Sequence, residues 1–385
     1  MAMIGLVGPF GSGCSFIGKI ICKDRNFKYI SLSKTLKDLY FQENDVEPNR
    51  RSDLQDFGDK VRQQYGNSVL AEKVWDEIKN DTNSDYIIDS FRHPDEVNFF
   101  RKRCSNFYLF GIFADYDIRW KRTKELYDDN ERDFKCDDSR DSGENFSYGQ
   151  KVSETFQTAD IVFQNNLNVI EGNEDYATLQ ENIRSYINVL KGSKAFMPTP
   201  DETYMTMAYA ASMRSSCLKR KVGAVIVDDM GNVFSSGYNE VPFTQRSCKK
   251  DYGQCYRDKL KSDFKQTLRN QIEDQTAQEK VYKTFKGSFK ILDYCRALHA
   301  EENAILNVAR IGASSALNKA TLYTTTYPCN LCANKIAQVG IKKIVYFEPY
   351  PMKEAKKILE KQGVKQTPFE GATYSGYFRL MEVIK

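Results

Sequence analysis

The sequence predicts an α/β protein built from two domains. The chain has 385 residues, which is more than a single domain usually holds. Both halves alternate short β-branched or apolar runs, typical of strands, with segments that have the apolar periodicity of helices. Between the halves, residues 191–202 contain glycine, serine and two prolines, a composition typical of a linker. We therefore expect one domain over residues 1–190 and a second over residues 203–385.

The first domain is expected to begin with a strand, a glycine-rich loop and a helix, at residues 4–8, 8–15 and 16–22. In this order, the backbone N–H groups of the loop and the N-terminus of the helix form a nest for anions such as phosphate. The loop supplies the first residues of a predicted phosphate or nucleotide site, to which a resemblance to P-loop nucleoside and nucleotide kinases adds an acidic residue at a strand end and two arginines of a later helix. These residues are Gly8, Gly11, Ser12, Gly13, Cys14, Ser15, Asp89, Arg119 and Arg122.

One position departs from the pattern of a phosphate-binding loop. Cys14 stands where a lysine is expected, and the missing cation should weaken binding of the β- and γ-phosphates. Ser15 can still meet a metal ion, so Mg²⁺ is expected together with a bound nucleotide. The sequence therefore favours a domain that binds or senses a nucleotide over an active kinase. A purely structural glycine turn is the alternative.

Shorter signals predict the rest of the first half. The resemblance to P-loop nucleoside and nucleotide kinases implies that residues 86–89 and 159–165 are core strands and that residues 117–122 belong to a helix that carries both arginines. These arginines could equally be ordinary surface charges. Residues 128–144 mix charges of both signs, which indicates a solvated loop.

The second half contains one imidazole, two thiols and one carboxylate in a spacing suited to a metal site. His299 and Glu301 are followed by Cys329 and Cys332, with Pro328 before the first cysteine. Residues 320–327 indicate a strand, and the proline suits the first position of a following helix, which would place both sulfurs on one face. A catalytic zinc needs three protein ligands and an open position for water. The pattern H-x-E…P-C-x-x-C is the signature of zinc nucleobase deaminases.

The expected chemistry is hydrolysis assisted by Zn²⁺ at His299, Cys329 and Cys332. Zinc lowers the pKa of a bound water to about 7, so that hydroxide can attack the carbon that bears the amino group. Glu301 is the predicted catalytic acid and base, which takes the water proton and delivers it to the ring nitrogen and to ammonia. The alternative is a structural zinc knuckle, but such sites normally close with four protein ligands.

Further motifs in residues 203–385 resemble those of deoxycytidylate deaminases of the cytidine deaminase superfamily. These motifs are R-S-S-C at 214–217, K-V-G-A-V-I-V at 221–227 and S-G-Y-N at 236–239. The resemblance implies that the substrate is bound by Arg214, Asn239, Ala300 and Tyr327. Asn239 could instead cap its own turn, because asparagine commonly does so. Glu240 replaces the final glycine of the usual G-Y-N-G pattern, which changes the backbone freedom of this loop.

Four more cysteines, Cys217, Cys248, Cys255 and Cys295, lie in the second half. The resemblance implies that they hold a second, structural zinc, and a set of four thiolates suits a tetrahedral site. Their spacing does not follow the compact C-x-x-C rule, so free thiols are the alternative.

The first half resembles P-loop nucleoside and nucleotide kinases. Together the halves resemble the bacterial antiphage dCTP/dCMP deaminases, which lower the deoxycytidine nucleotide pool. The implied fold is a P-loop kinase-like parallel-sheet domain followed by a cytidine-deaminase-like three-layer α/β/α domain. The implied partners are the dCTP or dCMP substrate, a regulatory nucleotide, further copies of the chain in an oligomer such as a hexamer, and an inhibitory RNA or protein.

Composition limits the remaining choices. The net charge of +4 is small for this length, which disfavours a protein that coats nucleic acid. Ten cysteines with no apparent signal peptide predict that the protein is located in a reducing cytoplasm. No apolar run approaches membrane-spanning length, so we expect no membrane partner. Residues 249–290 are charged and indicate an inserted segment with a helix over 258–283.

Three other functions remain open from the sequence. A housekeeping dCMP deaminase that supplies dUMP would use the same chemistry. A nucleotide-sensing switch would use the second half mainly as a partner surface, although the intact zinc pattern argues against this. A polynucleotide deaminase is disfavoured by the near-neutral charge.

Overall fold

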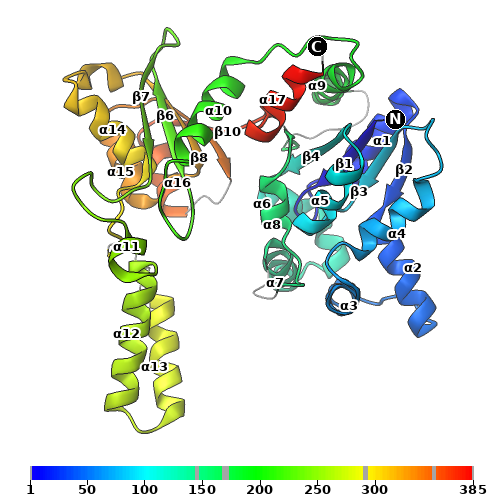
Figure 1. Cartoon of the computed structure of the whole chain (residues 1–385), viewed down its shortest axis with the longest axis horizontal. Helices are drawn as coiled ribbons and strands as arrows, with labels where there is room; N and C mark the ends of the chain where they lie inside the picture. Colours follow the sequence, from blue (N-terminus) through cyan, green and yellow to red (C-terminus); the bar gives the residue numbers. More distant parts are fainter. Residues whose placement is uncertain (1, 144–146, 167–172, 289–293, 349–352, 384–385) are drawn as a thin grey trace. The chain divides into compact units, whose positions relative to one another are not determined.

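The structure is a computed structural model that describes residues 2–143, 147–166, 173–288, 294–348 and 353–383 (Figure 1). The chain forms two compact units. The first unit contains Met1–Glu202 together with Glu370–Lys385, and the second unit contains Thr203–Phe369. The division after residue 202 agrees with the expected linker, but the second unit ends before the expected residue 385.

The first unit is built on a six-stranded sheet with the order β11-β5-β4-β1-β3-β2. Its strands are β1 (Met3–Val7), β2 (Lys28–Ser31), β3 (Tyr86–Asp89), β4 (Phe107–Phe113), β5 (Ile161–Gln164) and β11 (Gly371–Ala372). All neighbouring pairs are parallel except β11 with β5. β1 and β4 are buried on both faces, as expected for apolar runs inside a parallel sheet. The strands predicted at 4–8, 86–89 and 159–165 correspond to β1, β3 and β5.

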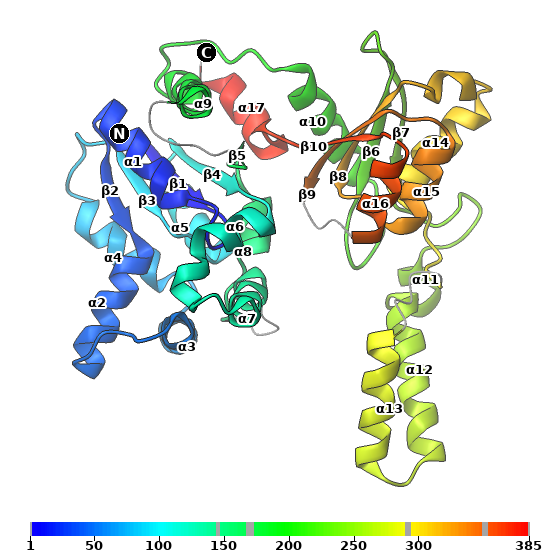
Figure 2. The ribbon, with the colours of Figure 1, turned by 180° about the vertical axis from the view of Figure 1, so that it is seen from behind.

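Helices flank this sheet (Figure 2). They are α1 (Cys14–Arg25), α2 (Leu32–Asn44), α3 (Arg51–Tyr65), α4 (Val69–Ile78), α5 (Pro94–Arg103), α6 (Tyr116–Thr123), α7 (Glu131–Ser142), α8 (Val152–Gln157), α9 (Glu174–Leu190) and α17 (Tyr374–Glu382), with a 3₁₀ turn η1 (Lys124–Tyr127). One core cluster joins α1 and α9 to the sheet through residues such as Ile17, Ile183 and Phe110. The glycine-rich loop lies between β1 and α1, as the sequence predicts.

The end of the chain returns to the first unit and completes its sheet. β11 pairs with β5, and α17 follows directly. Arg379 of α17 donates to Asp160 Oδ1 at 2.8 Å and to the carbonyl of Phe107 at 2.6 Å. Asp160 is fully buried, so this cation compensates its charge. Gly376 is required here, because a Cβ atom would lie 2.0 Å from the carbonyl oxygen of Asp160.

The predicted solvated loop at residues 128–144 is wrong. Residues Glu131–Ser142 form helix α7, whose N-cap Asn130 accepts hydrogen bonds from the backbone N–H groups of Arg132 and Asp133. The helix buries just Phe134 and Asp141, so its sequence shows no apolar stripe from which a helix could be predicted. Ion pairs, which periodicity does not reveal, fix the rest of the helix.

The second unit contains a five-stranded sheet with the order β10-β9-β8-β6-β7. Its elements are α10 (Pro200–Ser212), which begins at the boundary, β6 (Gly223–Val227), β7 (Val233–Tyr238), α11 (Cys248–Tyr252), α12 (Tyr256–Gln271), α13 (Gln275–Ser288), α14 (Ala300–Arg310), η2 (Ser314–Leu317), β8 (Thr321–Thr326), α15 (Asn330–Gln338), β9 (Lys343–Glu348), α16 (Lys353–Lys361) and β10 (Lys365–Pro368). β8, β9 and β10 are parallel, whereas β6 is antiparallel to both β7 and β8.

Two glycines allow helices to approach opposite faces of this sheet. A Cβ atom on Gly237 would lie 2.3 Å from the carbonyl oxygen of Ala300 in α14. A Cβ atom on Gly223 would lie 1.9 Å from the carbonyl oxygen of Ala208 in α10. Because Gly237 pairs with Ala224, the neighbour of Gly223, the two glycines face opposite sides. The unit therefore has three layers, with α14, α15 and α16 on one face and α10 on the other (Figure 1).

Thr199 caps α10, since its hydroxyl accepts from the backbone N–H of Glu202 at 3.2 Å. One expectation for the second unit needs correction. The helix predicted at 258–283 is a hairpin of α12 and α13, in which the rings of Phe264 and Phe285 stack with centroids 4.1 Å apart (Figure 2). Asp274 lies between the two helices and accepts from the backbone N–H of Thr276 at 2.8 Å, so α13 begins as a separate helix.

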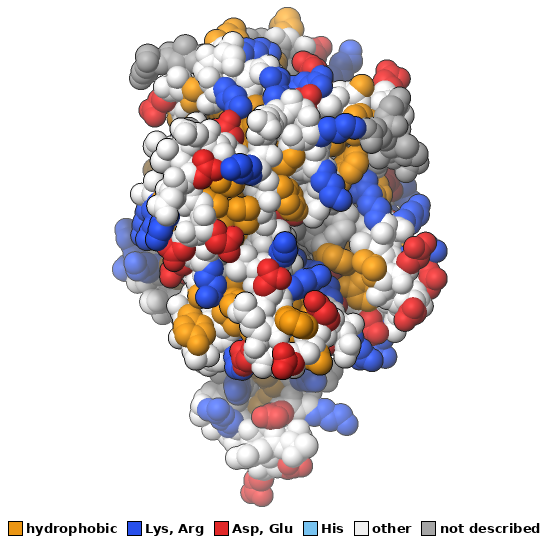
Figure 3. Space-filling model, turned by 90° about the vertical axis from the view of Figure 1, so that its right-hand side faces the viewer, with side chains coloured by type: hydrophobic (Ala, Val, Ile, Leu, Met, Phe, Trp, Pro, Cys, Tyr) orange, Lys and Arg blue, Asp and Glu red, His pale blue; other side chains and the backbone are white. Residues whose placement is uncertain are grey.

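The surface is polar and of mixed charge. On the face that Figure 3 shows, side chains of Lys and Arg alternate with those of Asp and Glu, and small apolar patches lie between them. This agrees with the small net charge of +4. Within the described ranges, every helix is too short or too polar to cross a membrane.

Candidate active site and metal centre

The three predicted zinc ligands meet where two helices of the second unit begin. His299 is the N-cap of α14, and Cys329 is the N-cap of α15, which follows β8. His299 Nδ1 lies 3.2 Å from Cys329 Sγ and 3.4 Å from Cys332 Sγ. All three donor atoms lie within 4.8 Å of one another, and no other described His, Cys, Asp or Glu residues form such a group. Pro328 precedes the N-cap and does not occupy the first helical position.

These side chains fit a zinc ion. Thiolate sulfur and imidazole nitrogen are typical zinc ligands, and three protein ligands leave one position open, as in catalytic sites. A hydrogen bond from Cys332, and then one with His299, lowers the pKa of Cys329 to about 4. The hydrogen bond to Cys329 also raises the pKa of His299. The start of α15 thus stabilises a thiolate, which is the form that binds a metal.

Two successive glutamates at the start of α14 have different surroundings. Glu301 is buried, its Oε2 lies 3.7 Å from Cys332 Sγ, and burial raises the pKa of its carboxyl group. Glu302 instead accepts from the backbone N–H of His299 at 3.3 Å and pairs with Lys335. The carboxylate beside the metal ligands is therefore that of Glu301, as the sequence predicts. A buried carboxyl with a raised pKa suits proton transfer near neutral pH.

Two predicted substrate residues flank the metal ligands in sequence and are buried. Tyr327 is 5% exposed, its ring packs edge-on against Tyr346, and its hydroxyl donates to Gln366 Oε1. Ala300 is fully buried between His299 and Glu301. Sequence reasoning missed Gln366, because its place beside Tyr327 depends on the pairing of β10 with β9.

Asn239 lies next to the metal site but uses both ends of its amide on the backbone. Its Oδ1 accepts from the N–H of Val222 at 2.7 Å, and its Nδ2 donates to the carbonyl of Arg220 at 2.8 Å. The adjacent Glu240 forms an antiparallel bridge with Leu298, the residue before His299. Asn239 therefore fixes the loop that borders His299.

The loop around Arg214 contacts the same segment, residues 238–240. The guanidinium of Arg214 lies over the ring of Tyr238, 4.9 Å from its centroid. Glu240 accepts from both the N–H and the hydroxyl of Ser216, each at 2.7 Å. A glycine at position 240 could not make these bonds. The departure from G-Y-N-G thus has a structural role that the sequence did not reveal.

None of the four cysteines of the predicted second site is in a disulfide within the described part of the chain. Among the described residues, no three of them bring their sulfurs within 4.8 Å of one another. The pKa of Cys295 is raised first by burial and also by the charges of Cys217 and Cys255, so these thiols lie near enough to interact.

The glycine-rich loop of the first unit has the expected neighbours. Ser15 Oγ donates to Asp89 Oδ2 at 2.7 Å, at the end of β3. Cys14 Sγ lies 3.6 Å from Ser12 Oγ, and burial, followed by the charge of Asp89, raises its pKa to about 12. The side chain at the position expected for lysine is therefore a neutral thiol. A Cβ atom on Gly8 would meet Ser12 and Cys14, so the loop packs tightly.

The two predicted arginines face the loop, and both already have hydrogen-bond partners within the chain. Arg119 is 6% exposed, and its guanidinium donates to the carbonyls of Phe10 and Ala114 and to Asp138. Gly11 and Gly13 have φ values of 82° and 95°, which suit glycine, and α6 packs on the former. Arg122 lies 3.4 Å from Asn165 Oδ1. Arg119 is therefore not an ordinary solvated charge, whereas Arg122 is exposed.

Comparison with known proteins matches the second unit to one family. The model of the cytidine and deoxycytidylate deaminase zinc-binding region matches residues 198–348. Deoxycytidylate deaminase of Schizosaccharomyces pombe is 37% identical over 158 residues, which are 41% of this chain and 39% of the yeast protein. Deoxycytidylate deaminase of Saccharomyces cerevisiae is 32% identical over 198 residues, 50% of this chain and 53% of that protein. The chain thus spans about half or less of these two relatives.

A shorter relative is covered over most of its length. Deoxycytidylate deaminase of Enterobacteria phage T2 is 36% identical over 154 residues, which are 38% of this chain and 79% of the phage protein. The family model includes His299, Glu301, Cys329 and the loop at Asn239. By this similarity and by its cluster of zinc-type ligands, the chain belongs to the cytidine and deoxycytidylate deaminase family.

Proposed function

We propose that the second unit deaminates deoxycytidine nucleotides, dCTP, dCMP or both, to deoxyuridine nucleotides by hydrolysis. The observation that supports this most strongly is the buried carboxylate of Glu301 beside the donors of His299, Cys329 and Cys332. The names of the three relatives support the substrate class. A purely structural zinc site would not need a buried carboxyl that binds no metal.

The residues divide the chemistry between them. His299, Cys329 and Cys332 would hold zinc, whose Lewis acidity makes a water nucleophilic near neutral pH. Glu301 takes a proton from that water and delivers it to the ring nitrogen of the base. Glu301 then takes the remaining proton of the hydroxyl now attached to the ring carbon and delivers it to the amino group. The bond between the ring carbon and the amino group breaks, ammonia leaves, and the hydroxyl becomes the carbonyl of the product. The burial that raises its pKa favours this exchange of protons.

The substrate side of the proposal rests on the loops beside the metal site. Tyr327 and Ala300 line the base pocket in this proposal, and Arg214 and the loop that Asn239 fixes contact the nucleotide. Asn239 keeps one further N–H of its amide for a ligand, because one donor already bonds Arg220.

A panel of dCMP, dCTP, CMP, CTP and short single-stranded DNA tests the proposal. We expect ammonia release from dCMP or dCTP and much less from the ribonucleotides or the DNA. Release from DNA alone would favour a polynucleotide deaminase, although Figure 3 shows no extended basic surface on its face. Glu301→Ala should release no ammonia while it retains zinc. An active Glu301→Ala protein would refute the mechanism.

A second structural zinc at Cys217, Cys248, Cys255 and Cys295 is also part of the proposal. It is supported by the effect of Cys217 and Cys255 on the pKa of Cys295 and by the chemistry of four thiolates. Metal analysis of the purified chain should find about two zinc ions and, in Cys255→Ser, about one. One zinc ion in both proteins would show that these thiols are free.

For the first unit we propose a regulatory nucleotide bound with Mg²⁺ at the glycine-rich loop. The contact between Ser15 and Asp89 supports this, since it brings a hydroxyl and a carboxylate together at the carboxyl ends of parallel strands. Calorimetry with ATP and Mg²⁺ should detect binding to the intact chain and weaker binding to Ser15→Ala. No heat with the intact chain would contradict the proposal.

The proposed biological setting rests on the order of the two units. A nucleotide-binding unit joined to a deaminase suits depletion of the deoxycytidine nucleotide pool in the cytoplasm during phage infection. An oligomer such as a hexamer and an inhibitory RNA or protein belong to this proposal. Housekeeping supply of dUMP is the alternative. Expression in a phage-sensitive host decides between them: defence requires that plaque counts fall with the intact chain and recover with Glu301→Ala.

A further inference from the structure

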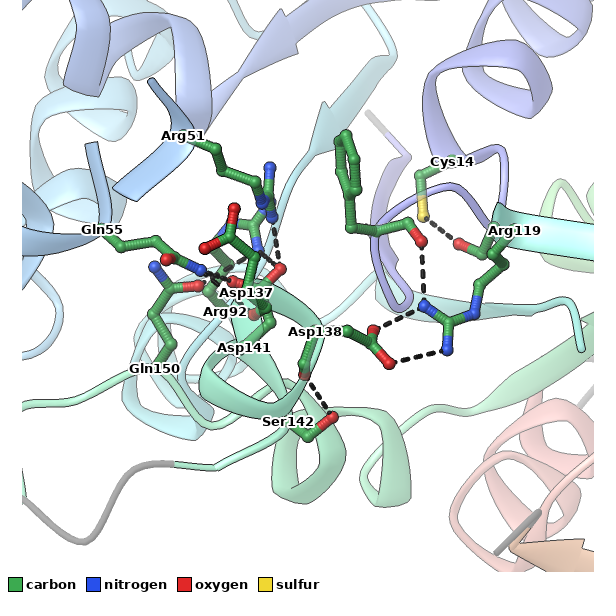
Figure 4. A network of polar contacts seen from close by, with 12 residues as sticks. Cys14, Arg51, Gln55, Arg92, Arg119, Asp137, Asp138, Asp141, Ser142 and Gln150 are labelled. Atoms are coloured by element: carbon green, nitrogen blue, oxygen red, sulfur yellow. Dashed lines mark hydrogen bonds and ion pairs between the residues drawn. The ribbon is translucent and has the colours of Figure 1, made fainter. Parts of the chain in front are cut away.

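Helix α7 of the first unit holds the arginines of three other elements (Figure 4). Asp138 accepts from Arg119 of α6 through both carboxylate oxygens, at 2.5 and 3.0 Å. Asp141 accepts from Arg92, which follows β3, at 3.0 Å and from Arg51 of α3. These two carboxylates are one turn apart on the same helix, so a single element neutralises all three guanidiniums.

Electrostatic contacts dominate the attachment of α7. Phe134 and Asp141 are its two buried side chains. Phe134 packs against the rings of Tyr116, Trp120 and Tyr127. The aspartates of α7 and Arg140 make ion pairs and hydrogen bonds with other elements. Such a helix is open to competition by another anion.

A small cleft lies beside Asp141 and is lined by two of these arginines, Arg51 and Arg92. Its volume is about 30 Å³, and Arg62, Gln55, Ser33 and Ser90 supply further polar groups to its wall. Gln55 is 2% exposed, and its Nε2 donates to Asp141 Oδ1 at 2.6 Å. Its Oε1 and the Nε atoms of Arg51 and Arg62 are buried, and none of them has a hydrogen-bond partner among the described residues. Unsatisfied polar atoms around a cleft point to a polar ligand.

The charges of the cleft are balanced by carboxylates of the chain itself. Arg62 lies 3.4 Å from Asp59 and 3.8 Å from Glu96, on helices α3 and α5. Arg51 and Arg92 are balanced by Asp141 of α7. An anion that enters the cleft must therefore replace a carboxylate. Asp141 is the candidate, because α3 and α5 bury several side chains each and α7 buries two.

The same contacts reach the glycine-rich loop. The guanidinium of Arg51 lies over the ring of Phe10, 3.9 Å from its centroid. Arg119 donates to the carbonyl of Phe10 at 3.0 Å. Removal of α7 would therefore leave three arginines around the loop and the cleft without their carboxylate partners. Guanidinium groups bind phosphate oxygens with the same bidentate geometry that Arg119 uses on Asp138.

We propose that α7 is a displaceable plug in the first unit: Asp138 and Asp141 hold Arg51, Arg92 and Arg119 until the phosphate groups of a ligand replace them. This deepens, and rests on, the nucleotide-binding role proposed for this unit. It adds the class of contact, phosphate on three arginines, and a competing element within the chain. Binding of the ligand releases α7, so occupancy of the site changes the surface of the unit.

Calorimetry on the full chain with inorganic tripolyphosphate tests the competition. The double variant Asp138→Asn and Asp141→Asn removes two charges at nearly constant shape, and it should bind at least about tenfold more tightly than the unaltered chain, because the guanidiniums lose their internal partners. Asp133→Asn is the matched control, since this exposed aspartate of α7 contacts its own N-cap. The control should bind like the unaltered chain. Equal affinity of all three would refute the plug but leave the phosphate site, and no binding to any of them would refute both.

Hydrogen exchange on the unaltered chain keeps the test independent of folding defects in the variants. Tripolyphosphate should speed the exchange of amides in residues 131–142 at least about threefold, because the ligand displaces the helix. The helices of the second unit should not change. Slower or unchanged exchange in α7 in the presence of bound tripolyphosphate would mean that the helix stays in place, and the plug would be refuted.

Discussion

Glu301 and Cys332 lie side by side in the second unit, with 3.7 Å between Oε2 and Sγ, and both side chains are buried. Because the carboxylate is adjacent to a metal ligand but lies outside the ligand set, it is free to move protons. Glu302, the next residue, instead caps His299 and pairs with Lys335. The two positions therefore offer a matched comparison.

We expect Glu301→Gln to lower kcat by about 10²- to 10⁴-fold, the usual contribution of a general acid and base. Glu302→Gln, which makes the same chemical change one residue away, should stay within a few-fold of the unaltered chain. Ammonia release measured together with zinc content checks both variants. Equal loss in the two proteins would point to damage of the helix start and would contradict a specific role for Glu301.

The metal cluster could be predicted from the sequence because each ligand lies in a short motif next to a helix start. His299 and Cys329 become N-caps for local reasons, and the strand before Cys329 is rich in threonine and tyrosine. The role of α7 could not be predicted in this way. Its partners are set by tertiary structure, since Arg92 and Arg51 lie 49 and 90 residues from Asp141. From sequence alone, a charged segment without apolar periodicity that forms a solvated loop cannot be distinguished from one that forms an ion-paired helix.

Asn239 provides a test of structural against substrate-binding roles. Its side chain makes two hydrogen bonds with the backbone of Arg220 and Val222. Asn239→Ala should therefore lower the free energy of unfolding by about 1–3 kcal/mol, at about 0.5–1.5 kcal/mol for each bond. Chemical denaturation measures this loss. Unchanged stability with a large rise in KM would show that the side chain serves the substrate and not the loop.

Because the end of the chain packs on the first unit, we expect the stability of this unit to depend on Arg379. This side chain joins α17 to the buried Asp160 and to the carbonyl of Phe107. Arg379→Ala should cost about 2 kcal/mol, the scale of hydrogen bonds to a charged group, because Arg101 still pairs with Asp160. Arg132→Ala, at an exposed position of α7, is the control and should be nearly neutral. Thermal denaturation of the full chain compares them, and equal melting temperatures would contradict the role given to α17.

The stability of the first unit should also depend on acid through Asp141. Burial opposes ionisation of this carboxyl, but the charges of Arg92 and Arg51 prevail and hold its pKa below the ordinary value of 3.8. The folded state therefore binds the proton less well than the unfolded state, and the stabilisation is present above pH 3.8 and is lost as the pH falls through the lower folded pKa. Removal of one partner from a buried ion pair costs about 3–5 kcal/mol. Asp141→Asn should thus melt well below the unaltered chain at pH 5–7, and the gap should narrow below pH 3.8. Asp133→Asn should show no such gap. A difference between Asp141→Asn and the unaltered chain that stays constant down to the acid limit of folding would contradict the ion pairs assigned to Asp141.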